Sequence, residues 1–524
     1  MVAINLTEMF ANLDRWPGRL LEARDGATVL TQTASTYTFR YPAPGGDYPN
    51  FRVEVKGTDF TYDNGEATGG DITGLRVLDA AGNLIVRFSG FAANTLASDF
   101  SQLWSNVFGN RDSNDDGPGA SAESAWSHLM SGNDVITGTS GNDRRVLVGV
   151  DAGNDRYNMG AGDDEVGGGV GNDTISGGDG FDRITFVDTT YNNGTNATQG
   201  IRVDVAAGTI TDCWGDTDRF TSVEAFEGSR FNDTFIGDAF RNEFAGLRGR
   251  DVFHGGAEQD QIRYDNDHWQ GGRRGIDVNL QTSVVNGAIK GTVRDGFGQT
   301  DTTFDIERVS GTRYDDKFVG SSENNVFWGG EGRDSFDGGG GTDDQVRFNR
   351  DFAGNGVGQV VIDLTRSSGQ IRNDGFGNVE TVRSIEGFEL GAAADTFKGN
   401  AANNFVAARE GADLLTGGGG NDTFAFYGDY DLGQRDRITD FKATGAVDNR
   451  DTLGFYAPDF EGMTGTLRLV NGTAATFNGG QFVYNAANDT LYWDADGTGS
   501  DQAIAVVRLD NVASLSAASF DIWT

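Results

Sequence analysis

The stretch that decides the fold reads GGVGNDTISGGDGFDRITF, from Gly168 to Phe186. It holds two nine-residue units in tandem, each with glycines, then an aspartate, then a short apolar segment. Glycine allows the positive φ angles of a tight turn, and apolar residues that alternate with polar ones are typical of a strand. We therefore expect each unit to form one turn followed by one short strand.

The same nine-residue period returns in four blocks, and in the last three an asparagine takes the second place. A short fixed period repeated in this way indicates a solenoid. If two units make one coil, residues 18 apart stack, so Asp155 should lie above Asp173 and Asp164 above Asp182. The residues in phase are Asp134, Asp143, Asp155, Asp164, Asp173, Asp182, Asp233, Asn242, Asp251, Asp260, Asp316, Asn325, Asp334, Asp343, Asp395, Asn404, Asp413 and Asp422.

Spacers of roughly 50 residues separate the blocks, and they are copies of one another. Each contains an alternating apolar run, then an Asp-aromatic-Gly turn, then a glutamate. The runs begin at Ile201, Ile276 and Val360, the turns at Asp212, Asp295 and Asp374, and the glutamates are Glu224, Glu307 and Glu386. The runs should be strands, and a glutamate that recurs once per repeat is better explained as a fold element than as a catalytic group.

The composition restricts the partners of the chain. It has 524 residues, a net charge of −37, 79 glycines, 6 prolines and the single cysteine Cys213. So much negative charge disfavours nucleic acids and anionic membranes and favours cations. One cysteine cannot form an intramolecular disulfide. The sequence has no apolar run of membrane-spanning length and no cleavable signal peptide, so the chain either stays in the cytosol or leaves by an uncleaved route.

Aspartate carboxylates beside glycine-rich turns suit calcium, which takes hard oxygen ligands, including main-chain carbonyls. The repeats offer no cysteine or histidine cluster for a softer metal. The competing interpretation is that the aspartates only form turns without metal. It is weak because stacked carboxylates would repel each other in a chain with few basic residues. We expect several Ca²⁺ ions, with folding that depends on them.

These nonapeptides resemble those of the RTX (repeats in toxin) family, whose G-G-x-G-x-D-x-U-x units wind into a parallel β-roll with calcium between the turns. The resemblance covers about Ser131 to Phe426. Three residues are inserted before Asp155, and Asp343 is followed by an extra aspartate, Asp344. The resemblance also implies a serralysin-like C-terminal cap, and the ending SFDIWT looks like an uncleaved signal for the type I secretion machinery, which implies a secreted protein.

The chain is therefore predicted to be all-β: a calcium-bound parallel β-roll or β-helix solenoid in several blocks, between a small β-rich N-terminal domain and a C-terminal β cap. In the N-terminal part, the runs from Phe51 and from Gly74 indicate strands and a hairpin, and Leu96 to Phe108 has helical spacing. The expected divisions are an N-terminal domain at 1–110, an acidic linker at 111–130, a first block at 131–186, three spacer-plus-roll repeats at 187–426, and a cap with secretion signal at 427–524.

Two other loops are rich in oxygen ligands. Asp112 to Glu123 fits the EF-hand loop formula, but Pro118 and Gly119 argue against it and favour a solvated linker. The loop around Asp494, Asp496 and Asp501 suits a calcium loop and a plain hairpin turn equally well.

No catalytic motif is apparent in the sequence. The histidines His128, His254 and His268 do not form H-E-x-x-H, and no G-x-S-x-G elbow occurs. Cys213 lies in an acidic turn, where a passive thiol is expected. We therefore expect a secreted, non-enzymatic protein with a structural role at the bacterial surface or matrix, as an S-layer or adhesin-like component. Its expected partners are calcium and, for surface assembly, copies of itself or cell-surface polysaccharide. The alternative is an exoenzyme that acts on polysaccharide or protein and uses the repeats for secretion and folding.

Overall fold

The computed structural model describes residues 135–138, 141–143, 153–187, 197–348, 358–428, 432–444, 450–463 and 466–524, together with the main chain of five strands between Thr28 and Ser89. The chain divides into two compact units, Met1–Asp260 and Gln261–Thr524. The expected linker at 111–130, the segment Leu96 to Phe108, the EF-hand-like loop and Asp134 lie outside the described residues.

The N-terminal strands form an antiparallel arrangement in which each strand pairs with the next. The predicted hairpin after Gly74 is present, with Leu75 opposite Phe88. These strands are β1 (Thr28–Gln32), β2 (Thr36–Tyr41), β3 (Phe51–Asp63), β4 (Glu66–Leu78) and β5 (Leu84–Ser89).

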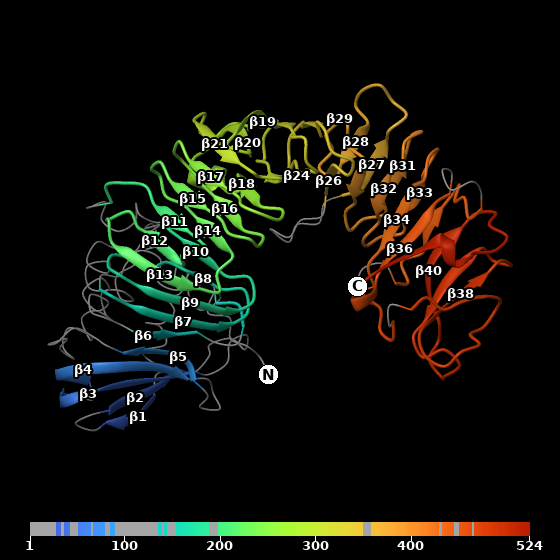
Figure 1. Cartoon of the computed structure of the whole chain (residues 1–524). Helices are drawn as coiled ribbons and strands as arrows, with labels where there is room; N and C mark the ends of the chain where they lie inside the picture. The colour runs from blue at the N-terminus through green and yellow to red at the C-terminus, as the bar shows by residue number, and fades with distance from the viewer. Residues whose placement is uncertain are drawn as a thin grey trace. The chain divides into compact units, whose positions relative to one another are not determined.

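The rest of the first unit is a solenoid of short parallel strands, stacked in succession in Figure 1. Strands that precede and follow one coil pair in parallel, as β7 with β9 and β8 with β10. The strands are β6 (Val135–Thr137), β7 (Arg156–Ala161), β8 (Glu165–Val166), β9 (Thr174–Asp179), β10 (Arg183–Thr185), β11 (Arg202–Asp204), β12 (Thr209–Thr211), β13 (Thr217–Thr221), β14 (Ala225–Glu227), β15 (Thr234–Ile236), β16 (Glu243–Ala245) and β17 (Val252–His254).

The spacer of this unit is an insertion within one sheet and not a side domain. Strands β11, β12 and β13 pair antiparallel with one another, while β13 pairs in parallel with β9 and β11 with β15. On the opposite face β10 pairs directly with β14. One sheet therefore gains strands that the other lacks.

The second unit repeats this plan. One face runs through β18, β22, β24, β26, β30, β32, β34 and β36 in parallel pairs. From its start to the end of the last block, the second unit contains the strands β18 (Gln261–Arg263), β19 (Asp277–Val285), β20 (Ala288–Arg294), β21 (Thr300–Phe304), β22 (Arg308–Ser310), β23 (Lys317–Val319), β24 (Val326–Trp328), β25 (Ser335–Asp337), β26 (Gln345–Arg347), β27 (Val360–Asp363), β28 (Ile371–Asp374), β29 (Thr381–Arg383), β30 (Gly387–Glu389), β31 (Thr396–Lys398), β32 (Phe405–Ala407), β33 (Leu414–Thr416) and β34 (Thr423–Phe426).

The C-terminal strands join the end of the last block. Strand β41 pairs in parallel with β36, and Phe520 packs against Phe455 and Phe482. Strand β40 pairs in parallel with β35 and continues into the antiparallel pairs β40–β39 and β39–β38. The remaining elements are β35 (Asp436–Ile438), β36 (Thr452–Tyr456), β37 (Leu469–Asn471), β38 (Gln481–Asn485), β39 (Thr490–Asp494), β40 (Ile504–Leu509), β41 (Phe520–Trp523) and the 3-10 helices η2 (Asp267–Gln270), η4 (Ala457–Asp459) and η5 (Ala517–Ser519).

The core of each coil is filled by the apolar residue two positions after the in-phase aspartate or asparagine. Phe235 stacks on Phe253 with ring centroids 5.2 Å apart, and Phe318 stacks on Phe336 at 4.9 Å. All four rings are buried. Each such side chain removes a large apolar surface from water. The core is therefore a stack of phenylalanine and aliphatic residues. Together with the parallel strand pairs described above, it confirms the prediction of an all-β parallel solenoid.

Candidate metal centres

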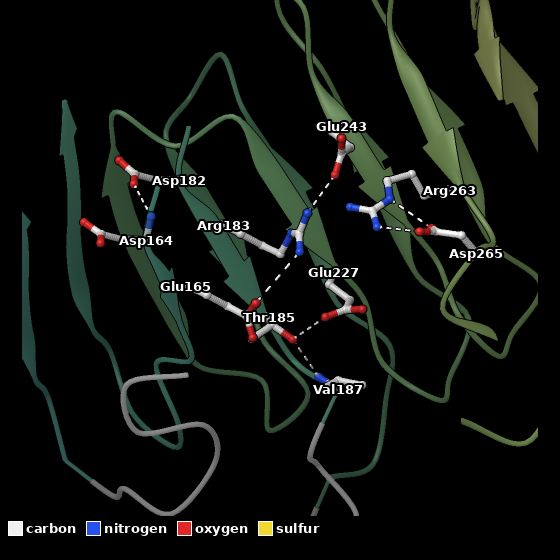
Figure 2. Close-up of polar contacts among 10 residues, drawn as sticks. All are labelled: Asp164, Glu165, Asp182, Arg183, Thr185, Val187, Glu227, Glu243, Arg263 and Asp265. Atoms are coloured by element: carbon white, nitrogen blue, oxygen red, sulfur yellow. Dashed lines mark hydrogen bonds and ion pairs between the residues drawn. The ribbon is translucent and has the colours of Figure 1, made fainter. Parts of the chain in front are cut away.

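The in-phase acidic residues lie in rows just before the strands, with their side chains buried inside the solenoid edge. In each row the main-chain N–H of one residue donates to a side-chain oxygen of the corresponding residue in the next coil. Figure 2 shows one such bond, from the Asp164 N–H to Asp182 Oδ1, at 2.9 Å. We call these series the carboxylate rows.

The bonds of the carboxylate rows recur in every block. The predicted stacking of residues 18 apart is present for Asp155 with Asp173, at 2.7 Å, and for Asp164 with Asp182. The further bonded pairs are Asp143–Asp164, Asp233–Asp251, Asn242–Asp260, Asp316–Asp334, Asn325–Asp344, Asp395–Asp413 and Asn404–Asp422.

Asp344, and not Asp343, occupies the row in the third block. The carboxylate of Asp344 accepts the Asn325 N–H at 2.7 Å and is buried, whereas Asp343 is exposed and bonds Gln345. The turn from Gly338 contains one residue more than the other turns, so the offset from Asn325 is 19 residues. Counting nine residues from Asp334 therefore reached Asp343, one position too early.

Residues of the spacers and of the C-terminal segment extend the rows, and the sequence predicted only some of them. Asp218 accepts the Asp173 N–H, Asp436 that of Asp413 and Asp451 that of Asp422. Glu224 and Glu386 reach the same position with a longer side chain and accept the N–H groups of Asp182 and Asp344. The recurring spacer glutamates thus have a visible structural role. Asp218, Asp436 and Asp451 follow their row partners by 45, 23 and 29 residues, so an unbroken run of in-phase residues at steps of nine does not reach them.

A second, exposed series runs beside the rows. The residue just before the row aspartate, usually asparagine, accepts a main-chain N–H from the neighbouring coil, as Asn154 does from Asn172 at 2.9 Å. The same bond recurs from Phe181 to Asp163, Arg250 to Asn232, Arg333 to Asp315 and Asn421 to Asn403. The repeated Asn-Asp dipeptide was the sequence signal for this series.

The turns differ in how many hydrogen bonds they donate to the side-chain oxygens of the row aspartate. In the first turn of each later block, the second oxygen is bonded by its own turn: Ser229 N–H donates to Asp233 Oδ2, Thr312 N–H to Asp316 Oδ2 and Gly391 N–H to Asp395 Oδ2. In other turns one oxygen has no hydrogen-bond partner among the described residues. These are the Oδ2 atoms of Asp164, Asp173, Asp182, Asp334, Asp413 and Asp422.

Burial makes the charged form of these carboxylates costly. It raises the pKa of Asp164 to about 7, of Asp173 and Asp413 to about 8, and of Asp334 to about 9. Neighbouring acids add to this: Asp155 raises the pKa of Asp173, and Asp316 that of Asp334. A buried carboxylate with an unbonded oxygen is unfavourable unless a proton or a cation compensates it.

The main chain around the unbonded oxygens can supply carbonyl ligands. A Cβ atom at Gly178 would lie 1.9 Å from the carbonyl oxygen of Gly160, and one at Gly180 would lie 2.0 Å from that of Gly162. Both glycines have positive φ, 124° and 135°. Carbonyls of one turn thus face the backbone of the next, where only glycine fits.

A cation in these turns would be held by main-chain oxygens as well as carboxylates. Within the described ranges, no three Asp, Glu, His or Cys side chains form a group that could hold a metal by themselves. Mixed carbonyl and carboxylate coordination is the preference of Ca²⁺. The residues present therefore fit calcium between adjacent turns.

The other candidate groups lie outside the carboxylate rows. Cys213 is fully buried, and burial raises the pKa of its thiol to about 12. Asp494 Oδ1 accepts the Gly497 N–H at 2.7 Å, and Asp496 Oδ2 that of Asp501, within the connection between β39 and β40. These bonds are those of a hairpin turn, and they leave the calcium alternative for this loop open. His268 lies in η2, and its ring contacts that of Trp269 in a tilted arrangement with centroids 4.5 Å apart.

Charged side chains pair across coils on one face of the solenoid. Arg183 on β10 reaches Glu243 on β16 at 2.8 Å and Glu165 on β8 at 3.8 Å (Figure 2). Thr185 donates to Glu227 at 2.9 Å in the same region. Such pairs neutralise acids outside the rows, so Arg183 is engaged elsewhere than at the row oxygens described above.

Comparison with known proteins identifies the repeats. A family model described as RTX calcium-binding nonapeptide repeat (4 copies) matches residues 130–144, 150–184, 227–262, 310–344 and 390–424. No curated protein matches the chain. Among solved structures, the extracellular lipase LipA from Serratia marcescens matches over 95% of this chain and 85% of its own, with 12% identity and a TM-score of 0.18. The nonapeptide repeats bind multiple Ca²⁺ ions, as the sequence predicted. In the described part of the chain, no helix has the length and apolar character needed to cross a membrane.

Proposed function

Because this chain carries RTX calcium-binding nonapeptide repeats, we propose that it is a secreted protein that folds on binding calcium and has a structural role at the bacterial surface or in the extracellular matrix. The carboxylate rows are the observation that carries this proposal. They join coil to coil in every block, so one kind of ion can stabilise the solenoid along its length.

The ligands in this proposal are the in-phase row residues. The carboxylates with an unbonded oxygen, such as Asp173 and Asp413, would bind the ion directly with neighbouring carbonyls. Asp233, Asp316 and Asp395, whose oxygens are already bonded by their own turns, would contribute less. The asparagines Asn242, Asn325 and Asn404 hold the same place in the row but carry no charge.

Calcium dependence supports a role outside the cell. Burial raises the pKa of Asp173 and Asp413 to about 8, so near neutral pH the folded chain without metal must hold protons that the unfolded chain would release, which costs stability. At the low calcium concentration of a cytosol the chain would remain largely unfolded, and it would fold at millimolar calcium. Export as an unfolded chain by a type I system fits this behaviour.

A structural role is supported by the repetition itself. Each coil presents the same positions at a fixed spacing, a property that suits lateral contact with copies of the chain or with a repetitive surface polymer. Cross-coil pairs such as Arg313 with Glu331, and Lys317 with Asp277, keep the outside of these coils polar.

The test combines assembly with location. Purified full-length chain should form sheets or filaments under the electron microscope in millimolar calcium and disperse in chelator. Fractionation of the source cells should place it at the surface. If the chain stays monomeric in calcium, is released to the medium and hydrolyses a polysaccharide or protein substrate, the structural proposal is wrong and an exoenzyme takes its place.

A further inference from the structure

The spacer turns contain acidic residues that the nonapeptide pattern does not include. Each spacer has two acids six positions apart in the pattern D-x-aromatic-G-x-x-[D/E], as Asp212 with Asp218 and Asp374 with Glu380. These four residues are at most 2% exposed. They lie outside the segments that match the family model.

In the first unit the turn is held rigidly by its own aspartate. Asp212 Oδ1 accepts the N–H groups of Trp214, Gly215 and Asp216 at 2.8 to 2.9 Å. Asp218 Oδ1 accepts the N–H of Asp173, the last aspartate of its row in the first block. The Oδ2 atoms of Asp212, Asp218 and Asp173 have no hydrogen-bond partner among the described residues.

In the second unit the same arrangement recurs with a glutamate. Asp374 braces the turn by accepting the N–H groups of Phe376 and Asn378. Glu380 and Asp334 directly precede paired strands, since Ser335 lies opposite Thr381 and the Thr381 N–H donates to the carbonyl oxygen of Asp334 at 3.2 Å. Neither Glu380 Oε2 nor Asp334 Oδ2 has a hydrogen-bond donor in the described structure.

A small cavity adjoins this second pair. Its lining includes Asp374, Glu380, Trp328 and the backbone of Gly329 and Gly330, and its volume is about 40 Å³. A Cβ atom at Gly329 would lie 2.2 Å from Asp334 Oδ2, so the unbonded oxygen of Asp334 abuts the cavity wall. This space exceeds the minimum for a water molecule, and it suits an ion with water better than an organic ligand.

The basic residue at this cavity is engaged with other groups. Arg347 lines the cavity, but its guanidinium bonds Gln345 at 2.9 Å and Glu389 at 3.1 Å. It also lies over the Trp328 ring. Arg347 therefore does not compensate the negative charge of Asp334 and Glu380, and this pair still requires a cation or a proton.

We propose that the spacer turns from Asp212 and from Asp374 each bind an additional calcium ion together with one row aspartate of the preceding block. In the first unit the ion is held by Asp173 and Asp218 beside Asp212, and in the second by Asp334 and Glu380 beside the cavity. Main-chain carbonyls and water complete the coordination, because two carboxylates alone are too few for Ca²⁺. Each ion ties a spacer to the block that precedes it.

The rival arrangement for each pair is a proton in place of the ion. A protonated Glu380 would donate to Asp334 and leave the cavity to water. The two arrangements differ in the number of calcium ions per chain, so counting them separates the hypotheses. The proposal is independent of whether the protein acts as a surface component or as an enzyme.

The experiment counts calcium bound to the full-length chain after equilibrium dialysis, for wild type, Glu380→Gln, Asp218→Asn and the control Glu323→Gln. Glu323 is an exposed acid of the same unit as Glu380. We expect each of the first two variants to lose one calcium ion per chain and the control to lose none. An unchanged count in variants that fold, as judged by circular dichroism, would overturn the proposal.

A measurement on the wild type covers the case in which a variant does not fold. Crystals of the intact chain grown in calcium should give an anomalous peak within bonding distance of the Glu380 and Asp218 carboxylates. The absence of a peak at both positions, with peaks present in the nonapeptide turns, would show that the pairs hold a proton and would refute the inference.

Discussion

The main-chain N–H of Asp164 donates to the carboxylate of Asp182, 18 residues later, at 2.9 Å. The backbone of one coil is thereby fixed to a side chain of the next, and that side chain still has one oxygen without a partner among the described residues. The carboxylate of Asp182 thus both sets the spacing between the two coils and offers an oxygen ligand for a metal ion. Folding and metal binding are coupled at each of these residues.

Removal of calcium should unfold the rolls. In excess chelator at pH 7.5 or above, the far-ultraviolet circular dichroism of the full chain should lose most of its β signal, because the buried row carboxylates must then either hold protons far above their ordinary pKa or carry charges that no cation compensates. The signal should return on adding millimolar calcium. An equally folded chain in both conditions would contradict the role of calcium as a folding ligand.

Acid should partly replace calcium. Burial raises the pKa of Asp173 to about 8 and that of Asp395 to about 6, both from an ordinary value of 3.8. Between the ordinary value and these raised values the folded metal-free chain binds more protons than the unfolded chain, so its stability falls as the pH rises through that window. In chelator, the β signal should be larger at pH 5 than at pH 8.

Calcium binding should show the opposite dependence on pH. Its ligands must lose protons to bind, so the apparent affinity should be lower at pH 5 than at pH 8, and binding near neutral pH should release protons. Titration in two buffers of different ionisation enthalpy would measure that release. A β signal in chelator that rises with pH would contradict the assignment of the raised pKa values to the rows.

Asp344 and Asp343 form a natural matched pair. Asp344→Asn removes the charge of a buried carboxylate that accepts the Asn325 N–H, so we expect a loss of about 1.5–3 kcal/mol in the stability of the calcium-bound form. Asp343→Asn, on an exposed residue, should stay within about 0.5 kcal/mol of wild type. Urea unfolding in saturating calcium measures both, and equal effects would place Asp343 in the row after all.

The phenylalanine stack should dominate the stability of the coils. Phe253 is fully buried and stacks on Phe235, so Phe253→Ala should cost about 3–5 kcal/mol. Phe240, in the same block, is 74% exposed, and Phe240→Ala should change the free energy of unfolding by less than about 0.5 kcal/mol. Thermal unfolding in calcium would compare the two variants with wild type.

The repeat period was sufficient to predict the solenoid and the stacking of its acids. Asp155 and Asp173 meet as expected because each coil has two turns and two strands of constant length. The prediction was wrong at Asp343, where one inserted residue moved the row to Asp344. A fixed period cannot detect a local insertion when both neighbouring residues have the required side chain.

Other parts of the site depend on contacts that no period encodes. Asp218, Asp436 and Asp451 enter the rows after segments of variable length, so only the fold brings them there. The repeat period also does not show which row carboxylates have both oxygens hydrogen-bonded and which have one oxygen without a partner. It follows from Ser229 and Thr312, whose N–H and hydroxyl groups bond the aspartate four residues later.

The spacers differ from the coils within a block, and this difference affects how the chain finds its correct alignment. Within a block every coil offers the same turn and the same phenylalanine, so a coil that paired one step out of place would satisfy nearly the same bonds. The links Asp182 to Glu224 and Asp344 to Glu386 span 42 residues and include antiparallel strands. A misaligned block would leave those strands without partners. The spacers thus fix the register of each block. They confine misaligned pairing to the few coils of one block and make each misaligned state less stable.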